Sequence, residues 1–243
     1  MNERELLVDC LRRLNRTGLT YYLTGSMASN FWGIPRTTHD LDFVLQLPMS
    51  VVPRIVEAFS GDFYIEEASV RAACRPPPQS RVGAKIGSEN CLGLSAAGVV
   101  ARSFRIPRIR ASLAPRWTPK SRRNFPELIF VPTPNAIDTR SALKVDFWLP
   151  KPEPFDREML RRRVEVTLFG QPAWIATAED VVLHKLVWNR ISPSERQLGD
   201  AAGIVAVQAE ALDERYMRHW AGELGLVGEV ERLLGGEIKP KNT

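Results

Sequence analysis

A set of hydrophobic side chains at helical spacing lies near the start of the chain. The set consists of Leu6, Leu7, Cys10, Leu11 and Leu14. Spacings of three and four place side chains on one side of a helix, so residues 3–16 are predicted to form an amphipathic helix. Cys10 falls on the hydrophobic side of this helix and is expected in the core.

Short hydrophobic runs alternate with further helical patterns as far as residue 66. Hydrophobic runs bounded by Gly, Pro and Asp are typical of strands. The predicted strands are residues 20–24, 41–47 and 63–66, and the predicted helices are residues 26–32 and 48–60.

A second alternation begins near residue 142 and gives way to helical patterns alone. The predicted elements are a strand at 142–149, a helix at 155–162, a hairpin of 163–169 with 172–175, and helices at 195–209, 213–224 and 227–234. Another helix is predicted from Thr177 to about Asn189, because Thr177 and Asp180 have the spacing of a capping box. Strands dominate the first part and helices the last, which predicts the α+β class, with a sheet domain over 1–176 and a helical domain over 177–243.

The stretch between residues 71 and 134 interrupts these patterns. Residues 71–132 contain twelve Lys or Arg and only two Asp or Glu, whereas the whole chain has 33 and 28. The basic charge therefore belongs to this Pro- and Arg-rich segment, which lacks sustained periodicity and is predicted to be a loop or disordered insertion without catalytic residues. Two interpretations stay open: an arm that contacts RNA or DNA phosphates, or an insertion that the fold tolerates at its surface.

Composition narrows the class of protein only modestly. The chain has 243 residues, and no hydrophobic run is long enough to span a membrane. The N-terminus lacks the hydrophobic region of a secretory signal, and three cysteines have neither the count nor the spacing of a disulfide framework or zinc site. A cytoplasmic location without membrane contact is expected.

Carboxylates and a small-residue turn supply the first candidate chemistry. Asp40 and Asp42 lie two positions apart at the start of a predicted strand, so both side chains point to the same face. Paired carboxylates repel each other unless a cation lies between them, and Mg²⁺ prefers such oxygen ligands together with substrate phosphates. Gly25 and Ser26 precede a predicted helix, whose N-terminal N–H groups could bind an anion.

A third carboxylate lies in the predicted strand at 142–149. Asp146 shares its face with Lys144 and sits between hydrophobic neighbours. A carboxylate inside a sheet is expected to have a partner, and a metal ion would supply one. An ordinary surface carboxylate is the alternative.

The run from Gly25-Ser26 to Asp40-Leu-Asp42 resembles the Gly-(Gly/Ser) … Asp-x-Asp signature of the DNA polymerase beta-like nucleotidyltransferases. Within that superfamily it is most similar to the bacterial minimal nucleotidyltransferases and AbiE-type toxin relatives, whose motif reads Pro-Arg-x-Thr-x-Asp-x-Asp. Arg36 and Thr38 fit this motif together with the two aspartates, and Ser26 stands where close relatives often carry glycine. The likeness covers residues 1–70 and about 135–235.

The resemblance implies a polymerase-beta-like sheet domain and a metal-dependent transfer of a nucleoside monophosphate from an NTP to a hydroxyl group. It implies two Mg²⁺ ions, with Mn²⁺ as an alternative, and an acceptor that is tRNA, a protein hydroxyl or a small molecule. An antitoxin protein would be a partner of the toxin-like relatives. The implied metal ligands are Asp40, Asp42 and Asp146, and the implied nucleotide-binding residues are Gly25, Ser26, Arg36, Thr38, Lys185 and Arg196.

Lys185 interrupts the hydrophobic side of the helix that begins at Thr177. The resemblance implies that it points to the nucleotide phosphates; the alternative is a lysine whose stem covers the core while its amine reaches solvent. His184 is expected to be a surface or capping histidine. Arg196 and Asp200 have the spacing of an ion pair on one helix.

Two other functions compete with transfer to RNA. One is a non-catalytic binding module that has kept the fold but lost the activity. The other is an antibiotic-type enzyme that modifies a small molecule.

Overall fold

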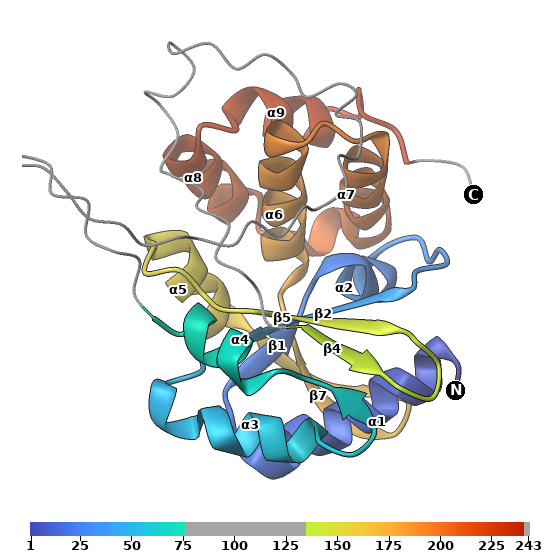
Figure 1. Cartoon of the computed structure of the whole chain (residues 1–243). Coiled ribbons are helices and arrows are strands. Elements are labelled where there is room, and N and C mark those ends of the chain that lie inside the picture. The colour runs from blue at the N-terminus through green and yellow to red at the C-terminus, as the bar shows by residue number, and fades with distance from the viewer. Residues whose placement is uncertain (76–134, 241–243) are drawn as a thin grey trace, which may run out of the picture. The chain divides into compact units, whose positions relative to one another are not determined.

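The computed structural model describes residues 1–75 and 135–240, and these belong to one compact unit (Figure 1). The expectations for residues 76–134, which make up most of the predicted insertion, lie outside the described residues.

A seven-stranded mixed sheet has the strand order β3-β4-β5-β2-β1-β7-β6. The strands are β1 (Tyr21–Leu23), β2 (Asp40–Leu45), β3 (Phe63–Tyr64), β4 (Asn135–Asp138), β5 (Lys144–Trp148), β6 (Val164–Leu168) and β7 (Gln171–Ile175). The pairs β2–β5 and β1–β7 are parallel, and the other neighbours are antiparallel.

Helices precede, separate and follow the strands, and after β7 the described chain is helical. The α-helices are α1 (Glu3–Thr17), α2 (Gly25–Trp32), α3 (Val52–Phe59), α4 (Glu67–Ala73), α5 (Pro154–Arg162), α6 (Ala178–Ile191), α7 (Glu195–Gln208), α8 (Glu214–Leu224) and α9 (Val227–Leu234), with 3₁₀ turns at Met49–Val51 and Ala209–Ala211. A mixed sheet with these helices confirms the α+β class, whereas the boundary at 176/177 stays a prediction. No helix in residues 1–75 or 135–240 is long and apolar enough to cross a membrane.

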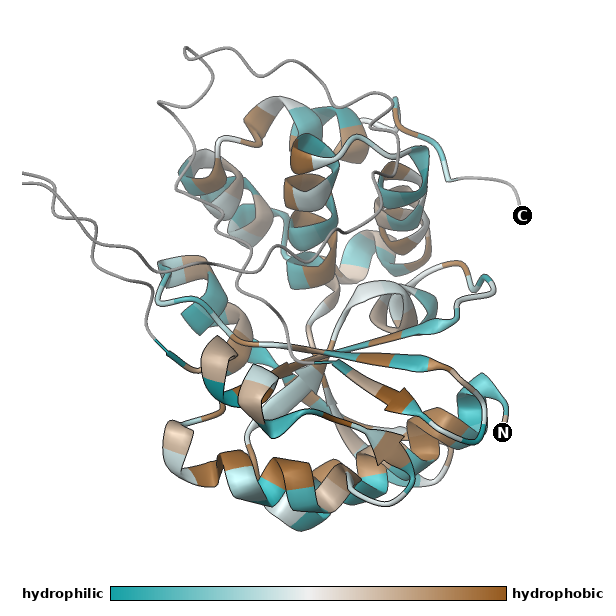
Figure 2. Ribbon diagram, in the orientation of Figure 1, coloured by the Kyte–Doolittle hydropathy of each residue, from teal (hydrophilic) through white to brown (hydrophobic). Residues whose placement is uncertain are grey.

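One face of the sheet is hydrophobic at the central strands β2 and β5. Phe43 of β2 and Phe147 of β5 are both buried on this face, and the ring centroid of Phe147 lies 5.0 Å from that of Phe59 in α3. Helices α1 and α3 pack together on this side, and hydrophobic and hydrophilic residues alternate along both (Figure 2). As predicted, Cys10 is fully buried in α1.

The opposite face carries the polar residues of β2 and β5. Asp40 and Asp42 point to this side of β2, as Asp146 does in β5. Helix α2 packs against β2 and also against α6 and α7. This face is therefore bordered by α2 and by the first two helices of the C-terminal part.

Helix α4 is an element that sequence patterns miss. It runs from Glu67 to Ala73, so regular structure extends past residue 71, where the insertion is predicted to begin. Only Val70 and Ala73 are buried in it, and two buried positions are too few to produce a recognisable period.

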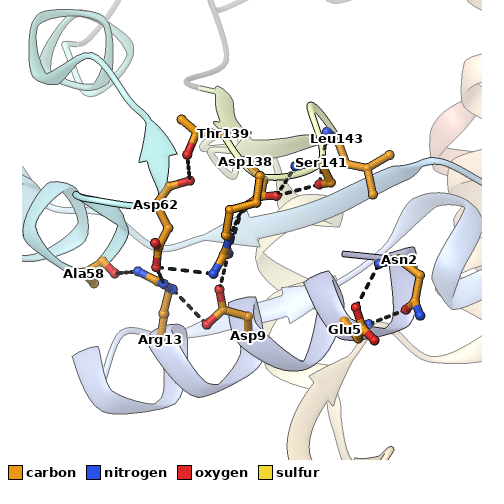
Figure 3. Close-up of polar contacts among 11 residues, drawn as sticks. Asn2, Glu5, Asp9, Arg13, Ala58, Asp62, Asp138, Thr139, Ser141 and Leu143 are labelled. Atoms are coloured by element: carbon orange, nitrogen blue, oxygen red, sulfur yellow. Dashed lines mark hydrogen bonds and ion pairs between the residues drawn. The ribbon is translucent and has the colours of Figure 1, made fainter.

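Strand β4 is also unpredicted, because its burial pattern is the reverse of what hydrophobicity suggests. Ile137 is 39% exposed, whereas the side chain of Asp138 is fully buried. The Asp138 carboxylate accepts hydrogen bonds from the backbone N–H and the hydroxyl of Ser141, and Arg140 pairs with it at 2.7 Å (Figure 3). Three partners make burial of this charge tolerable.

Arg140 belongs to an ion-pair network that joins α1 to the β3–β4 edge of the sheet. Asp9 of α1 lies between two guanidinium groups, with Arg140 Nη2 at 2.8 Å and Arg13 Nε at 3.1 Å. Figure 3 shows Asp9 next to Arg13. Arg13 also donates to the Ala58 carbonyl and to Asp62. The network ties α1 to the start of β3 and the end of β4.

Candidate active site

Two of the predicted carboxylates lie side by side. Strands β2 and β5 are parallel neighbours, and the register places Asp42 directly opposite Asp146. Side chains at paired positions of neighbouring strands share a face and are close together. The prediction that the third carboxylate lies on a neighbouring strand therefore agrees with the geometry, although its chemical role stays a prediction.

Gly25 packs directly against the Asp42 carboxylate. Its φ is +63°, in the left-handed region that favours glycine. A Cβ atom at this position would lie 2.1 Å from Asp42 Oδ2. The backbone N–H of Thr24 donates to the Asp42 carbonyl at 2.9 Å, so the turn before α2 is held to the strand that carries the carboxylate.

The N-terminus of α2 has no side-chain cap. Thr24 is the N-cap residue and makes no capping hydrogen bond. Its hydroxyl is buried and has no hydrogen-bond partner among the described residues. The N–H groups of the first helical turn are therefore not used by a side chain and can serve an anion.

Asp146 has a partner that the sequence interpretation did not assign. Lys144 Nζ lies 2.7 Å from Asp146 Oδ1. The contact lacks the geometry of a hydrogen bond, because Oδ1 is buried and has no hydrogen-bond partner in the described part of the chain. The Asp146 carboxylate therefore has an ammonium beside it, although Oδ1 receives no hydrogen bond from a described donor. Its predicted role as a metal ligand stays a prediction.

A divalent cation fits this site in part. The carboxylates of Asp146 and Asp42 are suitable ligands for Mg²⁺, but the Lys144 ammonium lies next to Asp146 Oδ1. Asp40 lies on the same face of β2 but is exposed. Within residues 1–75 and 135–240, no group of three His, Cys, Asp or Glu side chains is gathered closely enough to hold a metal ion.

The surroundings of Asp42 disfavour its charge. Burial raises the pKa of Asp42, the indole N–H of Trp148 lowers it by a hydrogen bond of 3.0 Å to Oδ1, and Asp146 and Asp40 raise it further. A carboxylate with a raised pKa next to other acids is typical of sites that bind a cation or handle a proton.

Three of the predicted nucleotide-binding residues meet around a residue that was not predicted to bind. Asp200 of α7 accepts two hydrogen bonds from Arg36, at 2.7 Å from Nε and 2.8 Å from Nη2. It also accepts one from Lys185 Nζ at 2.8 Å. Arg36 Nη2 donates to the hydroxyl of Ser26 at 2.9 Å.

Lys185 is buried and does not reach solvent. Its side chain is 7% exposed, as is that of Asp200. The alternative of a lysine whose amine reaches into water is therefore wrong. Burial lowers the pKa of Lys185, and Asp200 partly opposes this shift.

Thr38 and Arg196 lie at the margin of this group. Thr38 Oγ1 accepts a long hydrogen bond of 3.5 Å from the Asp40 backbone N–H. Arg196 is exposed, and the predicted pair between Arg196 and Asp200 is wrong, because Asp200 is paired with Arg36 and Lys185 instead. Local spacing predicts Arg196 as the partner of Asp200, but the partners in the structure are Arg36 and Lys185, which lie outside α7.

His184 is half-buried and lies beside Trp188, which in turn contacts Trp148. Its Nε2 accepts a hydrogen bond of 3.1 Å from Trp188 Nε1, and the Trp188 ring lies 5.7 Å from the ring of Trp148 in an edge contact. Burial and the nearby charges of Lys185 and Lys151 lower the pKa of His184 to about 4. The expectation of a surface or capping histidine is wrong.

Thr177 caps α6, but the capping box is incomplete. Its hydroxyl accepts from the Asp180 backbone N–H at 3.4 Å. The Asp180 carboxylate instead accepts a hydrogen bond of 2.6 Å from the Tyr216 hydroxyl of α8. The predicted start of α6 at Thr177 is confirmed, whereas the Asp180 side chain links α6 to α8.

Asp200 and Trp148 are the two residues in this site that sequence reasoning missed. Trp148 follows Asp146 by two positions in the same strand, so its presence on the polar face was readable from the sequence. Asp200 had no such signal, since its partner Arg36 is 164 positions away.

No protein-family model matches the sequence, and no curated protein matches it. Among solved structures, the chain is similar to the antibiotic-resistance factor ANT(2'')-Ia, with 8% sequence identity, a TM-score of 0.47 and coverage of 95% of this chain and 97% of that chain. It is also similar to an antigenic nucleotidyltransferase-like protein from Paracoccidioides brasiliensis, with 12% identity, a TM-score of 0.46 and coverage of 99% and 94%. Likeness of this degree leaves the function to be inferred from the side chains of the site.

Proposed function

We propose that this protein is a nucleotidyltransferase that moves a nucleoside monophosphate from an NTP to a hydroxyl acceptor. The observation that carries the proposal is the pairing of Asp42 with Asp146 beside an uncapped helix N-terminus. Half-buried Arg36 and buried Lys185 supply positive charge near the same helix. Carboxylates for a cation next to positive groups for phosphates are what transfer of a nucleotide requires.

Asp42 and Asp146 would hold magnesium, and Asp40 would join them from the same face of β2. When bound, the metal would activate the acceptor hydroxyl and neutralise the leaving pyrophosphate. Asp42 is held for this role by the indole of Trp148 on one oxygen and by Gly25 against the other. The close approach of the Gly25 backbone leaves little room for the carboxylate to rotate.

The turn at Gly25 and Ser26 would receive the β- and γ-phosphates through backbone N–H groups of α2. Arg36 and Lys185 would stabilise the charge that develops on these phosphates. Thr38 and Arg196 would act at the margin of the nucleotide, where both lie nearer to solvent. These assignments rest on position and charge.

The acceptor is proposed to be the 3′ end of tRNA, as in the toxin-like relatives that the signature resembles, with a cognate antitoxin as partner. A small molecule with a free hydroxyl is the alternative acceptor. The two acceptors are distinguished by supplying each of them to the same enzyme preparation and measuring which one receives the nucleotide.

A second candidate function is NTP binding without transfer. It is favoured by the position of the Lys144 ammonium, 2.7 Å from Asp146 Oδ1, because a resident cation weakens the need for a metal at this carboxylate. In that case the phosphate site would work while the carboxylate site would be inert.

The test incubates the full chain with each α-³²P-labelled NTP, Mg²⁺ and total RNA, and follows the label into RNA. We expect transfer from at least one NTP, its loss on addition of EDTA, and a loss of at least about 100-fold in Asp42→Asn and Asp146→Asn. Asp9→Asn is the matched control, because Asp9 also joins two cations but lies in the network at the sheet edge. We expect it to retain activity.

Three other results would redirect the proposal. NTP binding without transfer to any acceptor would support the binding module. Transfer to a hydroxyl-bearing antibiotic but not to RNA, detected by mass spectrometry, would support the small-molecule enzyme. Transfer that persists in EDTA would refute the metal-dependent mechanism.

A further inference from the structure

Asp200 occupies the centre of the cationic group at the proposed phosphate site. Its Oδ1 accepts from Arg36 Nε, and its Oδ2 accepts from both Arg36 Nη2 and Lys185 Nζ. The carboxylate comes from α7, the lysine from α6 and the arginine from the segment that follows α2. One side chain thus joins two consecutive helices to a segment that lies 164 positions away in sequence.

We propose that Asp200 is a positioning residue of the phosphate site, whose carboxylate holds the guanidinium of Arg36 and the ammonium of Lys185 together so that both can receive one triphosphate. This inference rests on the proposed function. It assigns to Asp200 no contact with the substrate.

The first argument is that the cations keep donors after Asp200 has been satisfied. An ammonium has three N–H donors, and Lys185 uses one of them on Asp200 among the contacts of the described chain. Arg36 presents the edge with Nε and Nη2 to the carboxylate, while its Nη1 contacts only the exposed Thr37 carbonyl in that part of the chain. The geometry therefore anchors the cations without using all of their donors.

The second argument is that a buried lysine beside a half-buried arginine needs a counter-ion. The charged groups that face Lys185 are Asp200, Arg36 and Asp42, and its neighbour His184 is held neutral. Without Asp200, Arg36 would repel Lys185 in surroundings that already disfavour its charge. Lys185 would then lose its proton at lower pH and cease to attract phosphate.

The third argument is that the arginine is held independently at its backbone. The Arg36 N–H donates to Asn30 Oδ1 at 3.1 Å, and Asn30 Nδ2 donates to the Arg36 carbonyl at 2.6 Å. The backbone of Arg36 is thus fixed to α2, and Asp200 decides where its guanidinium points. Loss of Asp200 should therefore misplace the charge without releasing the segment.

The test measures binding of inorganic tripolyphosphate to the full chain by calorimetry at about pH 6.5 and about pH 9, because a lysine whose pKa is lowered gives up its proton more readily as the pH rises. We expect Asp200→Asn to raise Kd at least about tenfold, with a larger effect at the higher pH. Asp200→Glu keeps the charge and should recover part of the affinity with the pH dependence of the unmodified protein. Asp9→Asn, which also removes a carboxylate between two cations, should leave Kd within about twofold, because Asp9 lies in the network at the sheet edge and not among the proposed phosphate-binding residues.

Each contrary result has a distinct meaning. If Asp200→Asn binds tripolyphosphate as well as or better than the unmodified protein, Asp200 is a competing anion and the inference is overturned. If the unmodified protein binds neither tripolyphosphate nor any NTP, the proposed function fails and the inference fails with it. If Asp200→Asn does not fold, Asp200→Glu decides: retention of the pH dependence supports the inference, and a loss as deep as that of Lys185→Ala overturns it.

Discussion

Asp42 is a carboxylate that the fold keeps between two other carboxylates. Burial is the main cause of its raised pKa, and the negative charges of Asp146 and Asp40 add to it. Such a group favours the folded state only when it is protonated. The folded chain therefore binds this proton at higher pH than the unfolded chain does.

This arrangement predicts that Asp42→Asn increases stability at neutral pH while it abolishes transfer. Between the ordinary pKa of an aspartate and the raised pKa of Asp42, the folded state holds more protons, so the free energy of unfolding falls as pH rises. An asparagine does not titrate, so its contribution to the free energy of unfolding does not fall as pH rises. It can still accept the hydrogen bond from Trp148. Thermal melts should show the variant above the unmodified protein at about pH 7 and equal to it near pH 4.

The exposed Asp40 provides the comparison on the same strand. Asp40→Asn should change the free energy of unfolding by less than about 0.5 kcal/mol at either pH. If Asp42→Asn were less stable than the unmodified protein at neutral pH, the strain assigned to the three carboxylates would be wrong.

His184 is the second residue whose charge the fold disfavours. Its pKa is lowered to about 4, mainly by burial, and Trp188 donates to its Nε2. The folded state stays neutral where the unfolded state begins to take up a proton. The contribution of neutral His184 to the free energy of unfolding is complete above the ordinary pKa of histidine. It is lost as pH falls toward 4.

We therefore expect the ring signals of His184 in NMR spectra to stay constant from about pH 8 to about pH 5 and to shift only near pH 4. His184→Gln should reduce the loss of stability over the same acid range. His219→Gln is the control, because His219 lies exposed on α8. A His184 signal that titrates at its ordinary pKa would contradict the burial described above.

At the scale of elements, the turn into α2 depends on the absence of a side chain at Gly25. Two costs combine there: a left-handed φ of +63° and a gap of 2.1 Å between the missing Cβ and Asp42 Oδ2. Gly18 ends α1 with a similar φ of +65° but has nothing within 4 Å of its missing Cβ. A comparison of alanine variants at Gly18 and Gly25 therefore separates the cost of backbone strain from the cost of contact with the Asp42 carboxylate.

Gly18→Ala should cost about 1–2 kcal/mol, the usual penalty of a left-handed residue with a side chain. Gly25→Ala should cost a further 1–3 kcal/mol or so from overpacking, and should abolish transfer by displacing Asp42. Urea unfolding and the RNA-labelling assay measure the two effects. If Gly18→Ala and Gly25→Ala lower the free energy of unfolding equally, the turn can move away from Asp42 without cost.

At the scale of the whole molecule, the described residues on both sides of the predicted insertion form one compact unit. Buried Val70 and Ala73 place α4 within the folded part, so a deletion should begin after Arg75 and not at residue 71. Removing 76–134 takes away ten Lys or Arg and two Asp or Glu, which makes the formal net charge negative instead of +5.

We predict that joining Arg75 to Asn135 through a Gly/Ser linker leaves a folded protein that still binds NTP. Circular dichroism and thermal melting report the fold, and RNA binding at several salt concentrations reports the charge. If only salt-dependent RNA affinity disappears, the basic segment is a nucleic-acid arm; if RNA affinity is unchanged, it is a tolerated insertion. A deletion that does not fold would mean that residues 76–134 supply part of the core.

The sequence alone determined the class of fold and most of its elements. Periodic hydrophobic residues identified α1, β2, β5 and the C-terminal helices within a few residues of their bounds, because the period of side chains along one element is local information. The same logic placed Asp42 and Asp146 on the polar faces of their strands. Their pairing followed from a resemblance in motif and agrees with the strand register.

Tertiary structure decided which charged groups meet. Asp138 is buried in β4 because Arg140 and Ser141 satisfy it, a reversal that hides the strand from any hydrophobic pattern. Asp200 pairs with Arg36 across 164 positions and with Lys185 of the preceding helix, while the local pair with Arg196 does not form. Spacing along a helix limits which partners are near, but the choice among them depends on desolvation and on groups that only folding brings together.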